Sequence, residues 1–405
     1  MRHPPSSRIL GCAFVALLAS GCASHDLKNP GQSWPPSPSV IAHRGASALR
    51  PEHTLAAYRK AIEDGADSVE PDLVATRDGV LVARHENEIS GTTNVAELAR
   101  FAARKTSKTI DGVAVSGWFT EDFTLAELKQ LRARERIPAN RPANTRYDDQ
   151  HAIPTLQEII DLVDGESRAR NKTIGLVPEL KHPSYFKSIG LPLERRLVDV
   201  LAANGYRGRD AAVFIQSFET GNLKELHAMA GYRLVQLVAA DGAPHDAVAA
   251  GSGLTYADMI TPDGLRAIAR YADVVAPYKT IVIPRDAGGA LGTPTRFVRE
   301  ARGAGLAVHV WTMRPENPFL PSDFRAAPVA SPSRRGDAAG EIRAYLEAGV
   351  DAIFTDDPAS GRRAVDSARK TLISSIHFSR KAVVLTNDPP VRKSVYATQR
   401  CPRKQ

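Results

Sequence analysis

The chain has 405 residues, of which 43% are hydrophobic and 24% are charged, so it is a globular protein with a sizeable apolar core rather than a disordered chain. Its three cysteines, Cys12, Cys22 and Cys401, are too few for a disulfide framework or for a multi-cysteine zinc or iron–sulfur site. The formal net charge of +8 is concentrated in residues 361–405, which hold eleven Lys and Arg against two Asp, and the nearly neutral body argues against a nucleic-acid partner.

Residues 1–22 are predicted to form an export signal that ends in a lipid-attachment site. Two arginines precede an apolar stretch over 9–19, and Ser and Gly lead from it into Cys22. A basic start, about eleven apolar residues and small residues before a cleavage point are typical of a secretory signal rather than a transmembrane helix. The cysteine resembles that of the lipobox of bacterial lipoproteins, although Ala19 stands where leucine is usual. We therefore expect an exported periplasmic protein with a lipid anchor on Cys22, and plain secretion is the alternative.

Residues 23–38 are rich in Ser and Pro and are predicted to be a tether between this anchor and the body. The body spans 39–360. Residues 361–405 are predicted to be a basic, disordered tail without helical periodicity. A solvated tail is the main interpretation, and binding to anionic lipid is the alternative.

Short apolar runs alternate with helical patterns along the body. Strands are expected over 40–42, 68–74, 80–84, 174–180, 213–215, 234–239, 274–276, 306–311 and 352–355. Helices are expected over 54–64, 156–163, 193–203, 220–230, 264–271, 295–304 and 337–348. Such alternation predicts an α/β fold with a mostly parallel sheet, either a closed barrel or a doubly wound sheet. No Gly-x-Gly-x-x-Gly follows the first strand, which weakens the dinucleotide-binding form of the open sheet.

One segment, over about 87–150, interrupts this alternation. It contains little strand signal, and 123–131 is its one clear helical pattern. We interpret the segment as an insertion on the active face of the sheet.

Histidines and acids follow four of the apolar runs directly. These residues are His43, the pair Glu70 and Asp72, His85, and Glu179 with Lys181 nearby. Barrel enzymes place their catalytic groups at the C-terminal ends of strands, which is where these side chains are expected. The spacing of two residues puts Glu70 and Asp72 on one face of their strand, and likewise Glu179 and Lys181.

The three carboxylates predict a metal site. Glu70, Asp72 and Glu179 would repel one another at one point unless a cation lay between them, and an all-oxygen ligand set favours Ca²⁺ or Mg²⁺ over zinc. The alternative is that Glu70 and Asp72 are surface acids on an edge strand, since Pro71 between them suits an edge.

The remaining polar groups point to phosphate chemistry. His43 and His85 could supply an acid and a base near neutral pH. Arg44 offers a forked donor that fits a phosphate group, and Lys181 offers a second positive charge. A metal ion, two imidazoles and two cations around one site suit the cleavage of a phosphate ester.

These residues lie in motifs that resemble the glycerophosphodiester phosphodiesterase family, and the match is closest to its bacterial periplasmic branch. The matching segments are 42–47 (AHRGAS), 51–54 (PEHT), 65–67 (GAD), 70–74 (EPDLV), His85, 122–125 (DFTL), 178–181 (PELK), 216–218 (QSF) and 354–356 (FTD). The resemblance spans about residues 39–360. It implies a (β/α)₈ TIM barrel with an inserted segment after the second strand region.

The resemblance also implies a set of roles. Glu70, Asp72 and Glu179 would bind one divalent cation, more often Ca²⁺ than Mg²⁺, while His43 and His85 would act as acid and base. Arg44 and Lys181 would hold the phosphate. The implied reaction is the metal-dependent hydrolysis of small glycerophosphodiesters to an alcohol and sn-glycerol 3-phosphate.

Four further positions have two interpretations each. Glu52 contacts glycerol or metal in some relatives, or it caps the following helix. Trp311 ends a strand and either forms an apolar wall for the glycerol or packs in the core. Asp356 is expected to cap a loop rather than to act in the site. Glu86 follows the second histidine where most family members have Asp, so the group that orients His85 is expected to differ.

Two other functions remain as alternatives. One is a related barrel that acts on intact phospholipids, which a wide apolar rim and a cyclic product would reveal. The other is a lipoprotein that binds its ligand without catalysis. The presence of both histidines and all three carboxylates argues against the second alternative.

Overall fold

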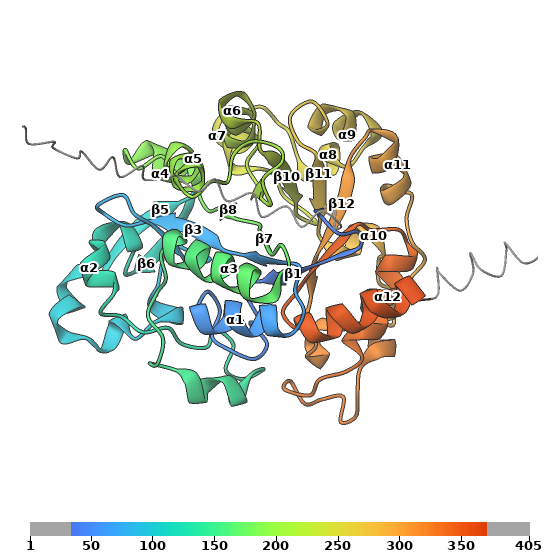
Figure 1. Cartoon of the computed structure of the whole chain (residues 1–405), viewed down its shortest axis with the longest axis horizontal. Coiled ribbons are helices and arrows are strands. Elements are labelled where there is room, and N and C mark those ends of the chain that lie inside the picture. The colour runs from blue at the N-terminus through green and yellow to red at the C-terminus, as the bar shows by residue number, and fades with distance from the viewer. Residues whose placement is uncertain (1–33, 371–405) are drawn as a thin grey trace, which may run out of the picture.

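The computed structural model describes residues 34–370 of the chain (Figure 1). The predicted export signal with Cys22, most of the predicted tether, and residues 371–405 lie outside the described residues. Within 34–370, none of the helices combines the length and the apolarity needed to span a lipid bilayer.

Eight parallel strand positions form a closed barrel in the described part of the chain, and two of them are interrupted at a proline. The second position consists of β2 (Ser68–Glu70) and β3 (Asp72–Ala75), and the third of β7 (Gly175–Leu176) and β8 (Glu179–Leu180). The other six are β1 (Ser39–His43), β9 (Phe214–Ser217), β10 (Arg233–Val238), β11 (Val274–Pro277), β12 (Ala307–Met313) and β13 (Ala352–Thr355). Neighbouring positions pair in parallel, and β1 closes the ring by pairing with both β2 and β13. The predicted barrel is therefore confirmed, and the doubly wound sheet is wrong.

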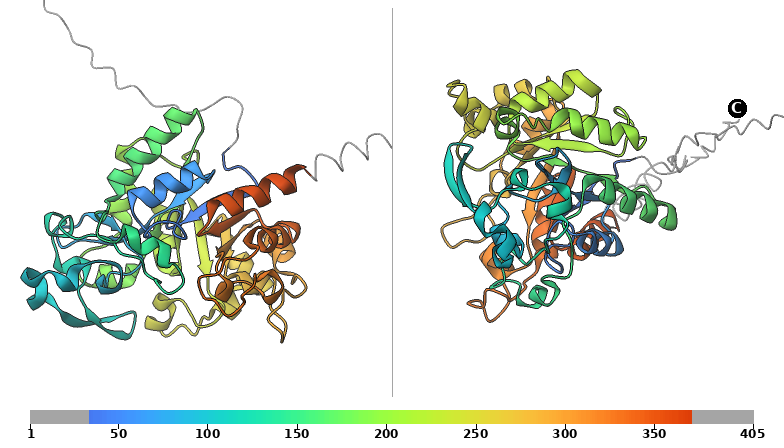
Figure 2. Two further views of the ribbon diagram at one scale, coloured as in Figure 1. Left: turned by 90° about the horizontal axis from the view of Figure 1, so that it is seen from below. Right: turned by 90° about the vertical axis from the view of Figure 1, so that its left-hand side faces the viewer.

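Helices surround the strands in all three views (Figures 1 and 2). The longer ones are α1 (Leu55–Glu63), α3 (Leu156–Arg170), α5 (Glu194–Ala203), α6 (Thr220–Ala230), α9 (Pro262–Ile268), α11 (Phe297–Gly303) and α12 (Ala338–Glu347). The shorter ones, α2 (Leu125–Leu128), α4 (Pro183–Ser188), α7 (His245–Ala249), α8 (Tyr256–Met259) and α10 (Lys279–Val282), lie in the connections. Thr54 begins α1 by accepting a hydrogen bond from the backbone N–H of Ala57, and the buried face of α1 includes Tyr58 and Ile62.

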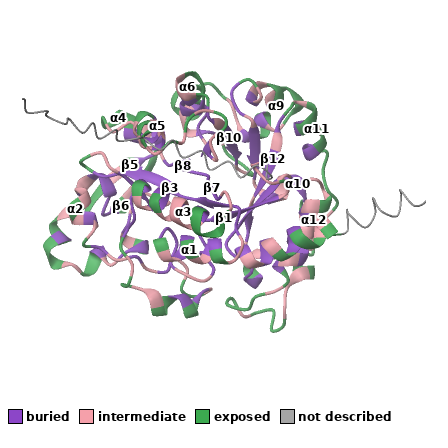
Figure 3. Ribbon diagram, viewed as in Figure 1, coloured by how far each residue is buried: buried purple, intermediate pink, exposed green. Residues whose placement is uncertain are grey.

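Side chains along the barrel strands alternate between two apolar clusters, and Figure 3 shows the strands as the most buried part of the fold. The cluster inside the barrel consists of Ile41, Val177, Phe214, Val235, Leu237, Val274, Ala276, Ala352 and Phe354. Neighbouring strand residues such as Val40 and Leu234 belong to the larger cluster that packs under the helices. These two clusters fix the strand ends that carry the polar groups.

Trp34 covers the end of the barrel where the strands begin. Its ring centroid lies 5.2 Å from that of Phe214, the first residue of β9, and the guanidinium of Arg233, the first residue of β10, lies 5.4 Å from the Trp34 ring. Residues 34–38 therefore pack against the barrel, and the predicted tether over 23–38 was placed too far along the chain.

The predicted tail likewise starts too early. Residues 358–370 are helical, and Ala364 and Val365 within this helix are fully buried. Arg369 donates a hydrogen bond to the carbonyl of Pro38 at 2.9 Å, so this helix ends beside the start of β1. Gly361 interrupts the apolar face of this helix, so the sequence does not show a helical pattern there. A Cβ added at Gly361 would lie 3.0 Å from Val40.

The predicted strand over 80–84 is not a barrel strand. It forms β4 (Leu81–Ala83), which pairs antiparallel with β3 after a turn at Arg77 and Asp78. The backbone N–H of Arg84 donates to the carbonyl of Asp72 at 2.9 Å, so the chain returns to the C-terminal end of the barrel. His85 reaches that end because β4 runs back toward it.

The segment over 87–150 contains short 3₁₀ turns, α2, and a hairpin that the sequence interpretation missed. Its strands are β5 (Thr106–Ile110) and β6 (Val113–Gly117), joined by Asp111 and Gly112 with φ of +49° and +82°. Asp-Gly is a common pair in tight hairpin turns, because both positions need positive φ. Most side chains of the hairpin are exposed, and the signals available in the sequence were the Asp-Gly pair and the apolar run over 113–115.

Candidate active site

Three carboxylates meet at the C-terminal end of the barrel. Glu70 ends β2, Asp72 begins β3, and Glu179 begins β8 directly opposite Asp72. One carboxylate oxygen of each residue lies within 4.8 Å of the others. The three residues are 1–5% exposed. Glu70 and Asp72 lie on the second strand position and Glu179 on the third, and each of these positions pairs with a neighbour on both sides. The alternative of surface acids on an edge strand is therefore wrong.

The three carboxylates differ in how readily they ionise. Burial raises the pKa of Glu70, and the nearby charges of Asp72 and Glu179 raise it further. Burial also raises the pKa of Glu179 to about 6, although Lys181 opposes this shift. Burial also opposes the ionisation of Asp72. His53, Lys181 and Arg44 outweigh this effect and hold the pKa of Asp72 below the usual range. A cation among the three oxygens would remove the repulsion that raises the pKa of Glu70.

The donor set fits a hard divalent cation. Asp72 Oδ2 accepts a hydrogen bond from His53 Nε2 at 3.0 Å, whereas the buried Oδ1 has no hydrogen-bond partner among residues 34–370. A buried carboxylate oxygen without a partner needs compensation, which a metal ion supplies. Three carboxylates without sulfur or nitrogen ligands suit calcium or magnesium. The protein therefore has a carboxylate cluster, Glu70, Asp72 and Glu179, that can hold such an ion.

His43 is fixed by a buried carboxylate. Its Nδ1 lies 2.5 Å from Asp356 Oδ1, and its Nε2 lies 4.0 Å from Glu70 Oε2. Arg141 and Arg314 both pair with the other oxygen of Asp356. Burial and the charge of Arg44 lower the pKa of His43 to about 4, although Asp356 opposes the shift. With Nδ1 donating to Asp356, Nε2 is left free to act toward the carboxylate cluster.

Asp356 was expected to cap a loop rather than to be a ligand; it does not join the carboxylate cluster, but its side chain pairs with His43 instead of capping a loop. It follows β13, which pairs with β1, so the C-terminal ends of the two strands lie side by side. The pairing of the first and last barrel strands brings together two residues that are 313 positions apart. The position of Asp356 after the last predicted strand was the signal available in the sequence.

His85 has a carboxylate in the equivalent position. Its Nδ1 lies 2.5 Å from Glu86 Oε1, and its Nε2 lies 3.3 Å from Lys181 Nζ. Arg136 holds Glu86 with contacts of 3.0 and 2.6 Å. Burial lowers the pKa of His85, and Arg44 and Lys181 lower it further. The glutamate at position 86 thus reaches the imidazole.

The two predicted phosphate-binding residues lie among these acids. Lys181 Nζ is 2.7 Å from Glu179 Oε1. The backbone N–H of Arg44 donates to Glu70 Oε2 at 3.2 Å, and its Nε lies 3.4 Å from Asp72 Oδ2. Arg44 has a φ of +58° and is followed by Gly45 at +88°, where an added Cβ would lie 2.7 Å from the backbone of α1. Glycine is required there because the loop packs directly on that helix.

Glu52 neither caps the helix nor joins the carboxylate cluster. Thr54 is the residue that caps α1, so the capping interpretation of Glu52 is wrong. Glu52 Oε2 accepts from Arg44 Nη1 at 3.1 Å, and Oε1 accepts from Arg136 Nη2 at 2.7 Å. Glu52 thus links the guanidinium of Arg44, beside the carboxylate cluster, to that of Arg136, which holds Glu86.

A cavity of about 80 Å³, the catalytic cavity, lies among these groups. Its polar lining comes from His43, Arg44, Glu70, His85, Glu179, Thr312 and Arg314, and its apolar lining from Phe218, Leu237, Trp311 and Phe354. Trp311 Nε1 donates to the carbonyl of Ala276 at 2.8 Å, which orients the ring. Trp311 thus lines the cavity.

The arrangement places an imidazole at each end of the carboxylate cluster. His43 approaches Glu70, while His85 reaches Glu179 through Lys181. A negatively charged ester held by cations in this cavity could receive a proton on one side and lose one on the other.

The glycerophosphoryl diester phosphodiesterase family matches the chain over residues 43–360. Among curated proteins, the chain is 32% identical to the glycerophosphodiester phosphodiesterase GDPD6 of Arabidopsis thaliana, covering 86% of this chain and 94% of that protein. It is 26% identical to the glycerophosphodiester phosphodiesterase of Haemophilus influenzae, covering 86% of this chain and 95% of that protein.

Solved structures of similar fold agree with this match. A glycerophosphoryl diester phosphodiesterase structure from Silicibacter pomeroyi superposes with a TM-score of 0.56 at 21% identity, over 82% of this chain and 95% of that one. An Oleispira antarctica phosphodiesterase, solved with the product sn-glycerol 3-phosphate, superposes with a TM-score of 0.51 at 21% identity, over 82% of this chain and 97% of that one. At this level of identity, the superpositions support the barrel fold.

Proposed function

Because the chain belongs to the glycerophosphoryl diester phosphodiesterase family, we infer that it hydrolyses glycerophosphodiesters to an alcohol and sn-glycerol 3-phosphate with the help of a divalent metal ion. The observation that carries this inference is the carboxylate cluster, whose oxygens lie within 4.8 Å of one another and have an imidazole at each end. Hydrolysis of a phosphodiester needs charge neutralisation and two proton transfers, and these groups can supply both.

The side chains of the site divide the work of the reaction. Arg44 and Lys181 bind the non-bridging oxygens of the phosphate and neutralise charge as it develops. Glu70, Asp72 and Glu179 would hold the divalent cation, which would supply Lewis-acid stabilisation of the phosphate charge. One imidazole, of His43 or His85, takes the proton of the attacking hydroxyl, which belongs to water or to the substrate's own glycerol. The other imidazole donates a proton to the departing alcohol oxygen. If the glycerol hydroxyl attacks, this step gives a cyclic glycerol phosphate, and water then opens the ring with the same two proton transfers to give sn-glycerol 3-phosphate.

Removing the metal tests this function. The protein is expected to release sn-glycerol 3-phosphate from glycerophosphocholine, and exhaustive chelation is expected to lower the rate at least about 100-fold, because the carboxylates then repel one another and the phosphate. Product release is measured with a coupled glycerol 3-phosphate dehydrogenase assay. Restoration by added Ca²⁺ is the control, and full activity after chelation would contradict a metal-dependent reaction.

We propose calcium rather than magnesium as the ion. The three carboxylates come from two neighbouring strand positions, and Lys181 and His53 already bond to two of them. Mg²⁺ demands near-ideal octahedral geometry, whereas Ca²⁺ tolerates irregular oxygen sets. Calorimetric titration of the metal-free protein with each ion distinguishes the two, and tighter binding of Mg²⁺ would contradict the proposal.

The carboxylate behind His43 is expected to matter for rate rather than for substrate binding. Asp356→Asn removes the charge that orients Nδ1 and stabilises the imidazolium, so kcat is expected to fall about 100- to 1,000-fold with KM little changed. Steady-state kinetics on glycerophosphocholine measure the two constants. Equal effects on kcat and KM, or a loss of folded protein by circular dichroism, would indicate a purely structural role for Asp356, which also pairs with Arg141.

We also propose that the protein belongs to the bacterial periplasmic branch of the family and is anchored to a membrane by lipid on Cys22. The support is the basic start, the apolar stretch over 9–19 and the small residues before Cys22. Mass spectrometry of the mature N-terminus tests the anchor. A lipid-bearing Cys22 supports it, and a mature chain without lipid contradicts it.

A further inference from the structure

A second cavity, the outer cavity, adjoins the catalytic cavity. Its volume is about 380 Å³, compared with about 80 Å³ for the catalytic cavity. Sites for small ligands usually measure about 300–1,000 Å³, so the catalytic cavity alone does not hold a whole diester. Glu179 and Phe218 line both cavities, and Lys181, which contacts His85, lines the outer one. The outer cavity therefore continues the site on the side of His85.

Three aromatic rings form a continuous wall between the two cavities. Trp311 lines the catalytic cavity, Tyr256 lines the outer cavity, and Phe218 lines both. The ring centroid of Phe218 lies 5.5 Å from that of Trp311 and 6.2 Å from that of Tyr256, both in edge-to-face geometry. A group that extends from the phosphate into the outer cavity passes along this wall. The faces of such rings attract cations.

Carboxylates surround the outer end of the wall. Asp111 and Glu219 line the outer cavity. Burial raises the pKa of the Tyr256 phenol, and the charges of Asp246, Glu179, Glu219 and Asp111 raise it further. These shifts indicate a negative potential at the Tyr256 ring, which favours a positively charged ligand group.

The two lining carboxylates have capacity for a cationic partner. Asp111 Oδ2 bonds to His182 Nδ1 at 2.6 Å, while Oδ1 has no hydrogen-bond partner within 34–370 and lies 3.8 Å from His245 Nε2. Glu219 accepts from the backbone N–H of Ser184 at 3.3 Å and from its hydroxyl. Burial raises the pKa of Glu219 to about 7, despite the Ser184 contacts, and no ion pair with a cation of residues 34–370 offsets this rise.

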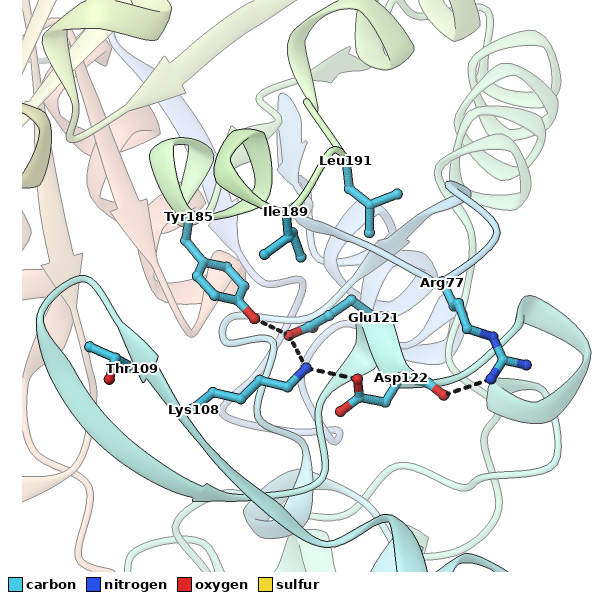
Figure 4. A pocket seen from close by; sticks show the side chains of 8 residues that line it. All are labelled: Arg77, Lys108, Thr109, Glu121, Asp122, Tyr185, Ile189 and Leu191. Atoms are coloured by element: carbon cyan, nitrogen blue, oxygen red, sulfur yellow. Dashed lines mark hydrogen bonds and ion pairs between the residues drawn. The ribbon is translucent and has the colours of Figure 1, made fainter.

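Asp111 is held in place by the hairpin that carries it. Figure 4 shows Lys108 of β5 between Glu121 and Asp122, with its Nζ 2.8 Å from an oxygen of each. Tyr185 of α4 donates to the same oxygen of Glu121 at 2.6 Å. These bonds fasten the hairpin to α4, the helix that follows the third barrel position. The hairpin therefore brings an acid of the inserted segment to the outer cavity.

We propose that the outer cavity binds the leaving alcohol of the diester and selects an alcohol that carries an ammonium group. Lys181 Nζ already lies 5.7 Å from the centroid of the Phe218 ring, so the selection depends on the Tyr256 ring and on the carboxylates of Asp111 and Glu219. This inference rests on the proposed diesterase function and adds the charge of the preferred alcohol to it.

The test compares two substrates of the same shape. Glycerophosphocholine carries a trimethylammonium group, and the glycerophosphodiester of 3,3-dimethylbutanol carries a tert-butyl group in its place. The wild-type protein with its metal is expected to show a kcat/KM about tenfold higher for the charged substrate, measured as release of sn-glycerol 3-phosphate. A ratio near one would overturn the proposal, since an apolar fit alone would then explain binding.

Variants test whether the preference for the charged substrate depends on residues of the outer cavity. Asp111→Asn combined with Tyr256→Leu is expected to lower the ratio of the two kcat/KM values from about ten to about two, whereas Tyr256→Phe keeps the ring and should keep most of the ratio. Asp263→Asn is the matched control, because this side chain is 90% exposed on α9, and it should leave the ratio unchanged. An unchanged ratio in the folded double variant would overturn the assignment to the outer cavity. The wild-type comparison decides the proposal if the double variant does not fold.

The experiment distinguishes failure of the charge selection from failure of the diesterase function. Release of sn-glycerol 3-phosphate from both substrates at equal rates contradicts the charge selection and leaves the diesterase function standing. Absence of release from either substrate contradicts the diesterase function, and the selection falls with it.

Discussion

Replacing His43 by alanine is expected to lower kcat for glycerophosphocholine by about 1,000-fold. The imidazole lies 4.0 Å from the carboxylate cluster through Nε2 and is fixed by Asp356 through Nδ1, so it is positioned to move a proton at the phosphate. Losing a positioned acid or base typically costs about 100- to 10,000-fold in rate. His85→Ala is expected to have a similar effect. The rate of sn-glycerol 3-phosphate release at saturating substrate measures both.

His227→Ala is the matched control for these two variants, because His227 is exposed on α6. It is expected to retain wild-type kcat. Thermal unfolding should show that His43→Ala remains folded, since the side chain it removes is polar and borders a cavity. Activity of folded His43→Ala within about tenfold of wild type would contradict its role in proton transfer.

Asp72→Asn is expected to weaken metal binding and to slow turnover strongly. The substitution keeps the shape of the side chain but removes one of the three charges that attract the cation, so the dissociation constant for Ca²⁺ should rise on the order of 100-fold or more. The rate should fall about 1,000-fold at moderate Ca²⁺ concentrations. Calorimetry measures the binding, and the coupled assay measures the rate.

Stability supplies a readout that does not depend on turnover. At a Ca²⁺ concentration 100 times its dissociation constant, a bound ion adds about 2.7 kcal/mol to the free energy of unfolding. The Tm of the wild type should therefore rise with Ca²⁺, and that of Asp72→Asn should not. Asp241→Asn, at an exposed position, is the control and should respond as the wild type does. A wild-type Ca²⁺ response in Asp72→Asn would show that the ion binds elsewhere.

The α/β class and the carboxylate cluster follow from patterns that are local in the sequence, whereas the closed barrel was predicted from the family resemblance. Each of Glu70 and Glu179 follows a short apolar run, and parallel strands bring their C-terminal ends to one edge of the barrel. Repetition of strand and helix over some 320 residues predicted the fold class. The two prolines, Pro71 and Pro178, divide strands that the apolar pattern shows as continuous, because proline has no N–H for the ladder.

Contacts between distant segments could not be predicted in this way. Asp356 reaches His43 only because the last strand pairs with the first, and Arg141 reaches Asp356 from the inserted segment, 215 positions away. His85 was expected at the end of a barrel strand, but it arrives on an antiparallel strand that folds back. The strands beside Asp111 could be read from the Asp-Gly turn and the apolar run over 113–115, but the contact of Asp111 with His182 could not be predicted. In each case the deciding interaction is tertiary.

The described chain begins at Trp34 and ends with the helix over 358–370. Both ends lie at the end of the barrel where the strands begin. In the left view of Figure 2 this end lies toward the top, while the cyan inserted segment lies at the lower left. The carboxylate cluster lies at the opposite end of the barrel, where the strands end. If the proposed anchor on Cys22 holds the protein at a membrane, attachment through the start of the chain would leave that end open to dissolved diesters.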